Sequence, residues 1–588
     1  MRHLQLLSDD DLAGLSSLLD NPISLNDATE SDLWFLSASL VAAIVSAKGA
    51  VNFRDWADVA RRTALPLAAI NALRPFFRLP DPDQLEARIS TRVTATGSDE
   101  RLRTRLNLSS GSWQAQWVLQ RDPEEYNLAD LSALSLSLRR DWGQVVLGTH
   151  RMNWGLGLVL AGEFATPRGE ALLRPVSRLV RLRTGFSNSN IGALRGAAAD
   201  IQWERLRLVA GTSARQTDIT RGPDGGPRVV AYRTHDAPAA TTGETLHYLA
   251  TTITVLGTRV GGLVSRYHLQ ATAETDLLRD MIYSLVIQRE YQGQLGAWQA
   301  THEQALRTTS TGPARGQNAS QTRLTFASPR GLGRAQLRLA LMYRRYPPGW
   351  TPLRGRAVGR RVSRGNESGW FFGWRISRSR LRVHGYLDLY QQREAESAGG
   401  WPRGGSEWGL TATASKRPAE VSAYYRQREE VSTSTVLDGR GLEVVAQQLA
   451  RSHYASLTWA HAWSAAISTR LIARVNVFPQ NGQVLWGRAT GGRLLLRIRS
   501  ASSLALGLHT YRSDGWEQRV TIYEDGLPGE FNLRALSGRG VRVHTRWGLN
   551  IGKGELSIRA AWQWQRSSSD PAVLERTVQT GLQMDVAL

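Results

Sequence analysis

Apolar and polar residues alternate along most of this chain, from about Arg101 to the C-terminus. Between 336 and 344 the sequence reads Gln-Leu-Arg-Leu-Ala-Leu-Met-Tyr-Arg, with leucine at alternate positions. The stretch 555–564 repeats the pattern, with Ile558 and Trp562 on one face and Ser557 and Arg559 on the other. A period of two indicates strands with one apolar and one wet face. Because almost no helical period interrupts it, we predict a large closed antiparallel sheet with lipid outside and water inside.

The connections between these segments differ in length. Short ones are Ser109-Ser110-Gly111, Asn481-Gly482 and Gly552-Lys553-Gly554, and long ones are Arg221–Pro227, Pro347–Gly369 and Gln391–Gly405. Short turns at one rim and long loops at the other are typical of a transmembrane β-barrel, and segments of ~10 residues plus connections predict on the order of 16–20 strands. The alternation of Leu582, Met584, Val586 and Leu588 fits a last barrel strand.

The chain has 20 tryptophans and no apolar run that approaches the ~18 residues of a membrane helix. Several tryptophans lie near expected strand ends: Trp113, Trp117, Trp370, Trp374, Trp562 and Trp564. This placement favours aromatic girdles at the two membrane interfaces. Ordinary core tryptophan is the alternative.

Residues 1–79 have a different pattern, of short helical segments with cap signals. Thr29 is placed to cap a helix that carries Leu33 and Leu36, and a break at Ser37-Ala38-Ser39 is expected before a second helix. Phe53 and Trp56 begin a second pair of helices, which Leu65-Pro66 interrupts and Phe76-Phe77 closes. We therefore predict a small all-α domain over 1–79, a linker over 80–100 and a barrel over 101–588.

The two helix–break–helix units resemble the tandem helix-hairpin-helix domain of competence-type DNA-uptake proteins. The resemblance covers the stretch from Asn21-Pro22-Ile23 to Asp32-Leu33 and the closing Ile70–Phe77. It implies DNA binding through hairpin backbone amides, which in that family follow a Gly-x-Gly. Neither hairpin here has glycine, so helix packing is the competing role. The candidate nucleic-acid contacts are Ser37, Ser39, Lys48, Arg54, Arg61, Arg62 and Arg74.

Further segments resemble large outer-membrane β-barrel proteins that begin with helix-hairpin-helix units. They are Leu147-Gly148, Asn153–Leu160, Leu194–Ala199, Gly243–Tyr248, Ile522–Gly529 and Ser537–Gly540. The resemblance implies a barrel in a Gram-negative outer membrane with the helical domain in the periplasm. The start, Met1-Arg2-His3-Leu4, lacks the apolar region of a signal peptide, so a leader must have been removed or the start assigned wrongly if this location holds.

The chain is strongly basic, with a formal charge of +22 and a pI of about 10.9. Lysine occurs only at Lys48, Lys416 and Lys553, so nearly all the basic residues are arginine. Arginine binds phosphate and carboxylate through a planar fork. The expected partners are therefore outer-membrane lipid, DNA or another anionic polymer, and an unidentified periplasmic protein. Solvated arginine filling the lumen and loops is the simpler explanation of the charge.

Motifs for catalysis are absent from the sequence. His302-Glu303 lacks the second histidine of a zinc protease, and Gly155-x-Gly157 lies in a strand pattern, where it favours close packing over phosphate binding. Gly185–Ser189 does not fit a nucleophile elbow, and there are no cysteines. We expect no enzyme, cofactor or metal, although a Ser–His site on neighbouring strands would leave no linear motif.

One charged cluster stands out near the C-terminus. Glu524 and Asp525 are followed by Arg534, Arg539 and Arg542. Ion pairs among them are expected to tie a loop to the rim or the lumen, with a gate or plug as the functional interpretation.

These observations predict an outer-membrane barrel that acts as a channel or docking platform in DNA uptake or envelope transport. A soluble, basic, β-rich nucleic-acid-binding protein is the main alternative, and a barrel hydrolase is a second one.

Overall fold

The computed structural model describes residues 23–587, apart from several gaps. These are 27, 29–32, 34–35, 37, 49–52, 54, 66–69, 71–72, 75, 80–84, 98, 122, 124–130, 141, 162–168, 177–178, 186–192, 222–226, 230–239, 273–274, 310–316, 329–334, 351, 360–364, 396–401, 438–442, 481–482, 499–501, 529, 531 and 567–572.

The N-terminal part folds as a small unit with its own apolar core. Its elements are β1 (Ile23–Ser24), α2 (Ala38–Lys48), α3 (Trp56–Thr63) and β2 (Phe77–Arg78). β1 and β2 pair in parallel and join the two ends of the unit. Leu25, Leu33, Ile44, Val59 and Phe77 are among the buried core residues. Within the described residues, the helices are all too short or too polar to cross a membrane.

The helices begin and end partly where the sequence suggested. Asp55 caps α3 by accepting a 2.6 Å hydrogen bond from the Asp58 amide, and Ala64 ends the helix in the left-handed conformation just before Leu65-Pro66. The break predicted at Ser37-Ala38-Ser39 is wrong in part, because Ala38 and Ser39 already belong to α2. Alanine at this position favours a helix, whereas the prediction depended on the flanking serines. Thr29 and Ser37 lie outside the described residues.

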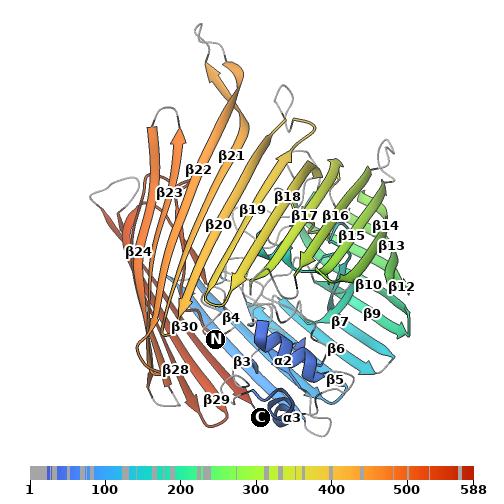
Figure 1. The fold of residues 1–588 in the computed structure, drawn as a ribbon, viewed down its shortest axis with the longest axis horizontal. Helices are drawn as coiled ribbons and strands as arrows, with labels where there is room; N and C mark the ends of the chain where they lie inside the picture. Colours follow the sequence, from blue (N-terminus) through green and yellow to red (C-terminus); the bar gives the residue numbers. More distant parts are fainter. Residues whose placement is uncertain are drawn as a thin grey trace.

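The rest of the chain forms one closed antiparallel β-barrel, whose described residues make 24 strands (Figure 1). The strands are β3 (Glu86–Thr96), β4 (Asp99–Ser110), β5 (Trp113–Arg121), β6 (Leu131–Arg140), β7 (Gly143–Trp154), β9 (Leu194–Trp203), β10 (Leu206–Arg221), β12 (Ala240–Val255), β13 (Thr258–Thr272), β14 (Thr275–Gly293), β15 (Gly296–Thr309), β16 (Gln317–Ala327), β17 (Gln336–Pro348), β18 (Gly365–Arg378), β19 (Leu381–Gln391), β20 (Gly404–Lys416), β21 (Ala419–Leu437), β22 (Glu443–Ala462), β23 (Ile467–Gln480), β24 (Gln483–Ile498), β25 (Ser502–Ser513), β28 (Arg539–Ile551), β29 (Gly554–Arg566) and β30 (Leu574–Ala587). The short strands β8 (Val180–Thr184) and β11 (Pro227–Val229) pair with β7 and β10.

The mainly β, transmembrane-barrel fold class is confirmed, but two details of the prediction are wrong. The barrel has more strands than the expected 16–20, because many connections have few residues and strands take up most of the chain. The barrel also begins inside the predicted linker 80–100. β3 pairs with β4 and with β30, and so closes the sheet. Its sequence, Glu-Ala-Arg-Ile-Ser-Thr-Arg-Val-Thr-Ala-Thr, is polar enough to resemble a linker.

The two rims of the barrel differ as predicted, except that β23 and β24, which the short connection Asn481-Gly482 joins, meet at the rim of the long loops. One rim carries tight turns such as 111–112, 204–205, 256–257 and 552–553, and the helical domain and the C-terminus lie at this end (Figure 1). The other rim carries the long connections, including those after β7, β10, β17, β19 and β25. We call these the short-turn rim and the long-loop rim. In outer-membrane barrels short turns face the periplasm, so the helical domain is on the periplasmic side.

An apolar band covers the outside of the barrel. On β14, Leu285 and Ile287 are exposed while Val286 and Gln288 between and beside them are buried, and β25 alternates in the same way. Soluble proteins do not expose apolar surface continuously around a closed sheet, whereas lipid requires it. The chain therefore spans an outer membrane, with every barrel strand paired on both sides.

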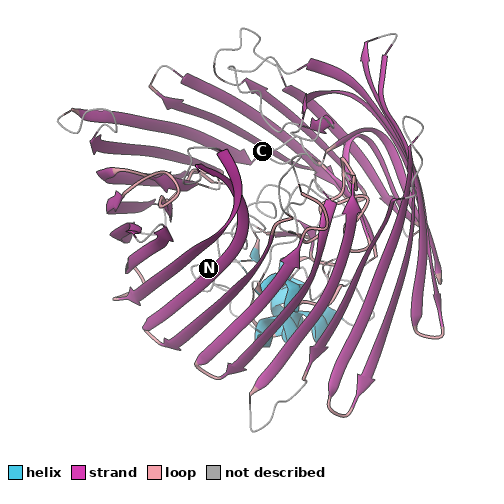
Figure 2. Cartoon of the chain, turned by 90° about the horizontal axis from the view of Figure 1, so that it is seen from above, coloured by secondary structure: helices cyan, strands magenta, loops and turns pink. Residues whose placement is uncertain are grey.

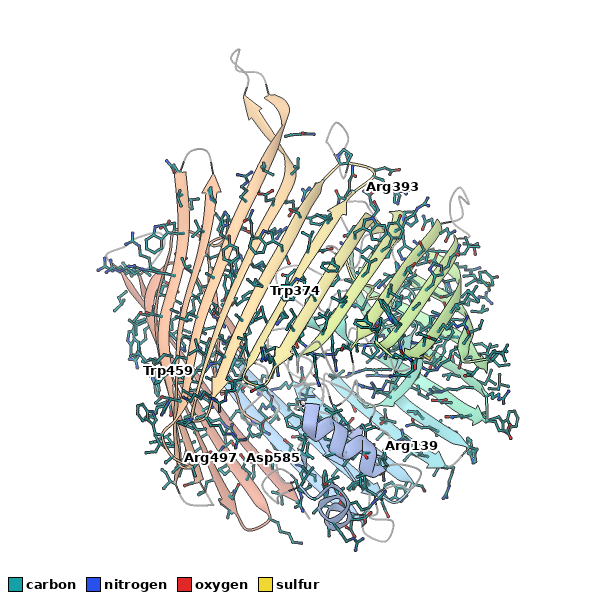
Figure 3. The ribbon with its side chains drawn as sticks, viewed as in Figure 1. Arg139, Trp374, Arg393, Trp459, Arg497 and Asp585 are labelled. Atoms are coloured by element: carbon teal, nitrogen blue, oxygen red, sulfur yellow. The ribbon has the colours of Figure 1, made fainter. Side chains whose placement is uncertain are left out.

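Aromatic side chains mark both edges of this band. At the short-turn rim Trp298 packs on Phe326 with ring centroids 4.5 Å apart, and Trp459 and Trp463 lie near each other. At the long-loop rim Tyr343 packs on Trp370 at 4.7 Å, and Trp408 on Tyr425 at 5.0 Å. Figure 3 shows Trp459 at the edge of the barrel, Arg393 at the long-loop end and Arg139 and Arg497 at the short-turn end. The arrangement is typical of aromatic girdles, and Trp370 is the residue of the predicted set among these pairs.

The lumen contains protein. Viewed from above, the ring of strands encloses several connecting segments (Figure 2). The described residues of three long-loop connections fold inward: 155–179 between β7 and β8, 349–359 between β17 and β18, and 514–538 between β25 and β28. The last of these contains the hairpin β26 (Val520–Tyr523) and β27 (Leu533–Leu536). The expectation of a lumen filled with water and solvated arginine is therefore wrong where these three connections lie.

Candidate functional site

The 155–179 segment enters the lumen around one buried carboxylate. The Leu156 and Leu158 amides donate to Glu303 Oε2 at 2.6 and 3.4 Å, and the Ser284 hydroxyl donates to Oε1 at 3.1 Å. Gly155 has φ +53°, and a Cβ there would lie 2.6 Å from Glu303 Oε2. The glycine therefore permits the backbone to approach a carboxylate, which is a different role from the predicted strand packing.

Inward-facing amides and one arginine of the barrel wall bind the next part of the same segment. The Gln299 side chain accepts from the Val176 amide at 2.5 Å and donates to its carbonyl at 2.9 Å, and Gln288 donates to the same carbonyl at 2.5 Å. Arg323 donates to the Leu172 carbonyl at 2.6 Å. Because these contacts satisfy backbone groups in the lumen, the segment is anchored to the wall at Leu172 and Val176 as well as at Leu156 and Leu158.

The 349–359 segment packs against the first and adds an ion-pair cluster. The Arg356 amide donates to the Gly157 carbonyl at 2.9 Å. Arg354 Nε lies 2.8 Å from Glu244 Oε1, and Arg215 Nε lies 3.0 Å from Glu244 Oε2. Leu158, Trp350 and other side chains of the two segments join inward residues of the wall in the barrel's main apolar cluster. Apolar burial and buried charge together hold these two segments.

A single 3₁₀ turn, η2 (Glu170–Leu173), connects this plug to the facing strands. The Glu170 carboxylate pairs with Arg375 at 2.5 Å, and His384 Nδ1 lies 3.7 Å away. Burial raises the pKa of the Glu170 carboxyl, but the charges of His384, Arg375 and Arg382 lower it to about 2. The group is therefore ionised at neutral pH and pairs with the wall.

The 514–538 segment is held mainly through Glu524, whose side chain is fully buried. Arg542 Nη2 and Arg559 Nη2 each lie 3.0 Å from Glu524 Oε2, and Arg542 Nε contacts Oε1. Asn532 Nδ2 donates to Oε2 at 3.1 Å. Burial raises the pKa of this carboxyl, but the hydrogen bond and charge of Arg542, with further positive charge from Arg559, outweigh burial and hold the pKa at about 2.

Further wall residues grip the same segment. Asp525 pairs with Arg493 of β24, and His544 Nε2 lies 3.9 Å from Asp525 Oδ2. Arg474 and Arg92 donate to the carbonyls of Thr521 and Pro528. A small apolar cluster of Ala489, Tyr511, Val520, Ile522 and Leu536 lies beneath the hairpin. Charged and polar contacts therefore dominate here, in contrast to the other two segments.

The predicted lumen residues do not all meet. Glu524 lies against Arg542 as expected, and Asp525 pairs with Arg493 instead of with a residue of the predicted set. Arg534 lies on β27. Burial lowers the pKa of Arg534, and the positive charges of Arg542 and Arg559 lower it further. Arg539 is exposed, and its place in the alternation of β28 puts it on the outer face, away from the cluster. The prediction failed for Arg539 because it used proximity in sequence and ignored strand phase.

The residues predicted to contact DNA contribute largely to packing of the helical domain. Arg62 donates to the carbonyls of Ala47 and Lys48 at the end of α2, pairs with Asp58 at 3.3 Å and lies 4.7 Å from the centre of the Phe53 ring. Lys48 Nζ donates to the Ala28 carbonyl at 3.3 Å.

The other candidate contacts are more exposed or incompletely described. The Arg61 side chain is 76% exposed but pairs with Asp58 at 2.7 Å, and Arg74 lies 5.8 Å from the Trp56 ring. Ser37 and Arg54 lie outside the described residues, and Ser39 is described only as part of α2. DNA binding stays a prediction.

Sequence reasoning missed several residues that hold the lumen closed, among them Glu303, Arg323, Glu244 and Arg559. Glu303 was considered only with His302, although the two adjacent side chains face opposite sides of the wall. The usable signal was a charged residue on the inward face of an otherwise apolar strand pattern. Its partner cannot be found locally, since Glu303 and Leu156 are 147 residues apart.

No protein-family model and no curated protein matches this chain. Solved structures similar to it include the siderophore receptor PirA from Acinetobacter baumannii, at 6% identity and a TM-score of 0.44, which covers 86% of this chain and 80% of that one. PirA from Pseudomonas aeruginosa is similar at 8% identity and a TM-score of 0.44, over 87% and 81% of the two chains. The FrpB iron transporter from Neisseria meningitidis is similar at 9% identity and a TM-score of 0.42, over 86% and 81%.

Proposed function

We propose that this outer-membrane barrel is a gated transport protein whose gate is the 514–538 segment. The observation that carries the proposal is that this segment fills the lumen through ion pairs centred on Glu524 and Asp525. A connection that only shaped a rim would not need buried charges from β24, β28 and β29. Because buried ion pairs are costly to desolvate and are lost when one partner changes, they suit a closure that must be reversible.

The other two luminal segments are better suited to a fixed plug. They share the main apolar cluster of the barrel, and amide and backbone contacts bind them in addition to the ion pairs of Arg354 and Glu170. Apolar burial does not respond to charge or pH in the way that an ion pair does. We therefore assign 155–179 and 349–359 to permanent narrowing of the pore and 514–538 to its opening.

The absence of cysteine from the chain permits a direct test. A Cβ built at Gly581 on the barrel wall lies 2.9 Å from Leu527 Cδ1 of the gate segment. The double variant Leu527→Cys/Gly581→Cys therefore places two thiols where a disulfide would tether the gate. Ion current through planar bilayers is recorded for the oxidised and the reduced protein during voltage ramps.

We expect the oxidised protein to remain shut and the reduced protein to open as the wild type does. The single variants Leu527→Cys and Gly581→Cys, treated identically, serve as controls for the effect of each substitution and of the reductant. Equal currents from the oxidised and reduced double variant, with the disulfide verified by mass spectrometry, would rule out 514–538 as the gate.

A further inference from the structure

Three arginines form a row on the outer face of the barrel at the long-loop rim. They are Arg488 on β24, Arg512 on β25 and Arg539 on β28, and all are exposed. Arg488 lies directly opposite Arg512, and Arg512 directly opposite Arg539. Since neighbouring strands are about 4.8 Å apart, the row crosses about 10 Å of the outer surface. We call these three residues the arginine row.

The alternation along each strand fixes the direction in which these residues face. The residues of opposite strand phase are buried toward the lumen, as Ala489, Tyr511 and Arg542 show. Leu508 and Val541, which share the outer face with the row, are exposed in the apolar band. The arginine row therefore borders the band on the side where the outer leaflet of the membrane ends.

Within the part of the chain that the structure describes, none of the three guanidinium groups of the arginine row forms an ion pair. Arg488 and Arg512 instead lie 4.8 and 5.2 Å from the centre of the Trp486 ring. Asp514, opposite Trp486, accepts the Trp486 amide at 2.8 Å. Like charges directly opposite each other destabilise a sheet, so this arrangement calls for an external anion.

The neighbouring strands extend the same chemistry. Arg576 on β30 lies opposite Trp564 on β29, and Trp564 lies opposite Val541 on β28. Arg566 ends β29 on the same outer face and is exposed. Tryptophan beside arginine, at the edge of an apolar band, is suited to a molecule with an anionic head and an apolar body.

We propose that the arginine row binds the phosphorylated headgroup of an outer-leaflet lipid, with the acyl chains of that lipid lying on the apolar band below. The planar guanidinium binds phosphate through two parallel hydrogen bonds, and three of them on adjacent strands surround one headgroup. The site is on the outside of the barrel and shares no residue with the gate, so it stands or falls independently of the transport proposal.

The test uses the full-length protein in neutral detergent, titrated with diphosphorylated lipid A and, separately, with the same lipid after enzymatic removal of both phosphates. Bound lipid is counted by native mass spectrometry. The row variant is Arg488→Gln/Arg512→Gln/Arg539→Gln. The matched control, Arg140→Gln/Arg289→Gln/Arg378→Gln, removes the same charge from exposed outer-face positions toward the short-turn rim.

We expect wild type and control to bind lipid A equally and the row variant to bind it at least about tenfold more weakly. Dephosphorylated lipid should bind weakly and equally to all three, and Arg512→Gln alone should shift affinity in the same direction as the row variant. The proposal is overturned if the row variant binds as wild type, if the control loses as much, or if lipid without phosphate binds wild type equally well. Full competition by inorganic phosphate at the lipid's own concentration would also overturn it, since it would indicate a free-anion site.

Discussion

Replacing Glu524 by glutamine tests the gate at its most buried charge. Glutamine keeps the shape of the side chain but removes the negative charge that Arg542 and Arg559 share, each at 3.0 Å. Two guanidinium groups then lie close together in the lumen without the carboxylate that they share, and Arg559 alone keeps a carboxylate partner, Glu530. Opening of the segment exposes both groups to water, so the substitution destabilises the closed state more than the open one.

The size of the effect follows from the contacts that remain. Removing one partner of a buried ion pair costs about 3–5 kcal/mol. Arg542 keeps its hydrogen bonds to Gln563 at 2.9 Å and to Gln579 at 2.8 Å, and Arg559 keeps Glu530 at 3.4 Å. These contacts place the cost near the low end, about 3 kcal/mol, which lowers the ratio of closed to open protein roughly a hundredfold.

Single-channel recording at neutral pH measures this ratio directly as the fraction of time spent open. The control is Glu555→Gln on β29, which removes an ion-paired carboxylate that lies outside the gate contacts and is bound to Arg546 at 3.2 Å. An open fraction that is the same for Glu524→Gln, the control and the wild type would refute the electrostatic gate. A lower melting temperature without any change in open fraction would assign Glu524 to stability alone.

Three other predictions address acid, the barrel wall and the helical domain. The pKa of Glu524 is held at about 2 in the closed state and returns toward 4.5 when the gate opens, so this group stabilises closure above pH ~4.5 and does so progressively less as the pH falls toward 2. In a pH series of single-channel recordings, we expect the open fraction to rise across that window and, as far as Glu524 determines it, to stay constant from pH 5 to 7. The Arg344 guanidinium lies 2.6 and 2.7 Å from Glu367 and Asp388, so Arg344→Gln leaves both carboxylates buried without a counter-charge and should destabilise the barrel by about 3–5 kcal/mol in urea unfolding. The control Arg345→Gln, on the exposed face, should change the free energy of unfolding by less than ~0.5 kcal/mol. Arg62→Gln removes the side chain that caps the C-terminus of α2 and should destabilise the helical domain by about 1–2 kcal/mol in hydrogen exchange, while Arg61→Gln should leave the stability of the domain unchanged. If the domain binds duplex DNA, Arg61→Gln alone should weaken DNA binding by the full-length protein in a salt titration.

The sequence was sufficient for those features that each strand carries by itself. Alternation along 336–344 or 555–564 reports which side chains face lipid, because both neighbours of an outward residue face inward. It was insufficient for the number of strands, since barrel strands range from 9 residues in β5 to 20 in β22. β3 escaped prediction because its outer face carries mostly short or polar side chains.

The site was predictable only where its parts lie close in sequence. Glu524 and Arg542 are 18 residues apart, and that nearness placed both in the predicted cluster. Arg354 and Glu244 are 110 residues apart, and no local pattern links them. Such pairs depend on strand order and on which connections fold inward, and both of these are properties of the closed barrel.

The hydrogen bonds of the buried arginines give a chemical reason for the near absence of lysine. Arg344 reaches Glu367 through Nε and Asp388 through Nη1, which requires two donors fixed in one plane. Arg542 likewise binds Glu524, Gln563 and Gln579 at once. A lysine ammonium is a compact point charge and cannot hold three strands in register in this way. On the outer face, the fork of Arg512 is equally suited to phosphate. We infer that arginine serves two environments in this barrel, paired with carboxylates inside and open to anions at the outer rim, and that an Arg542→Lys substitution would keep the charge of the gate but lose its closure.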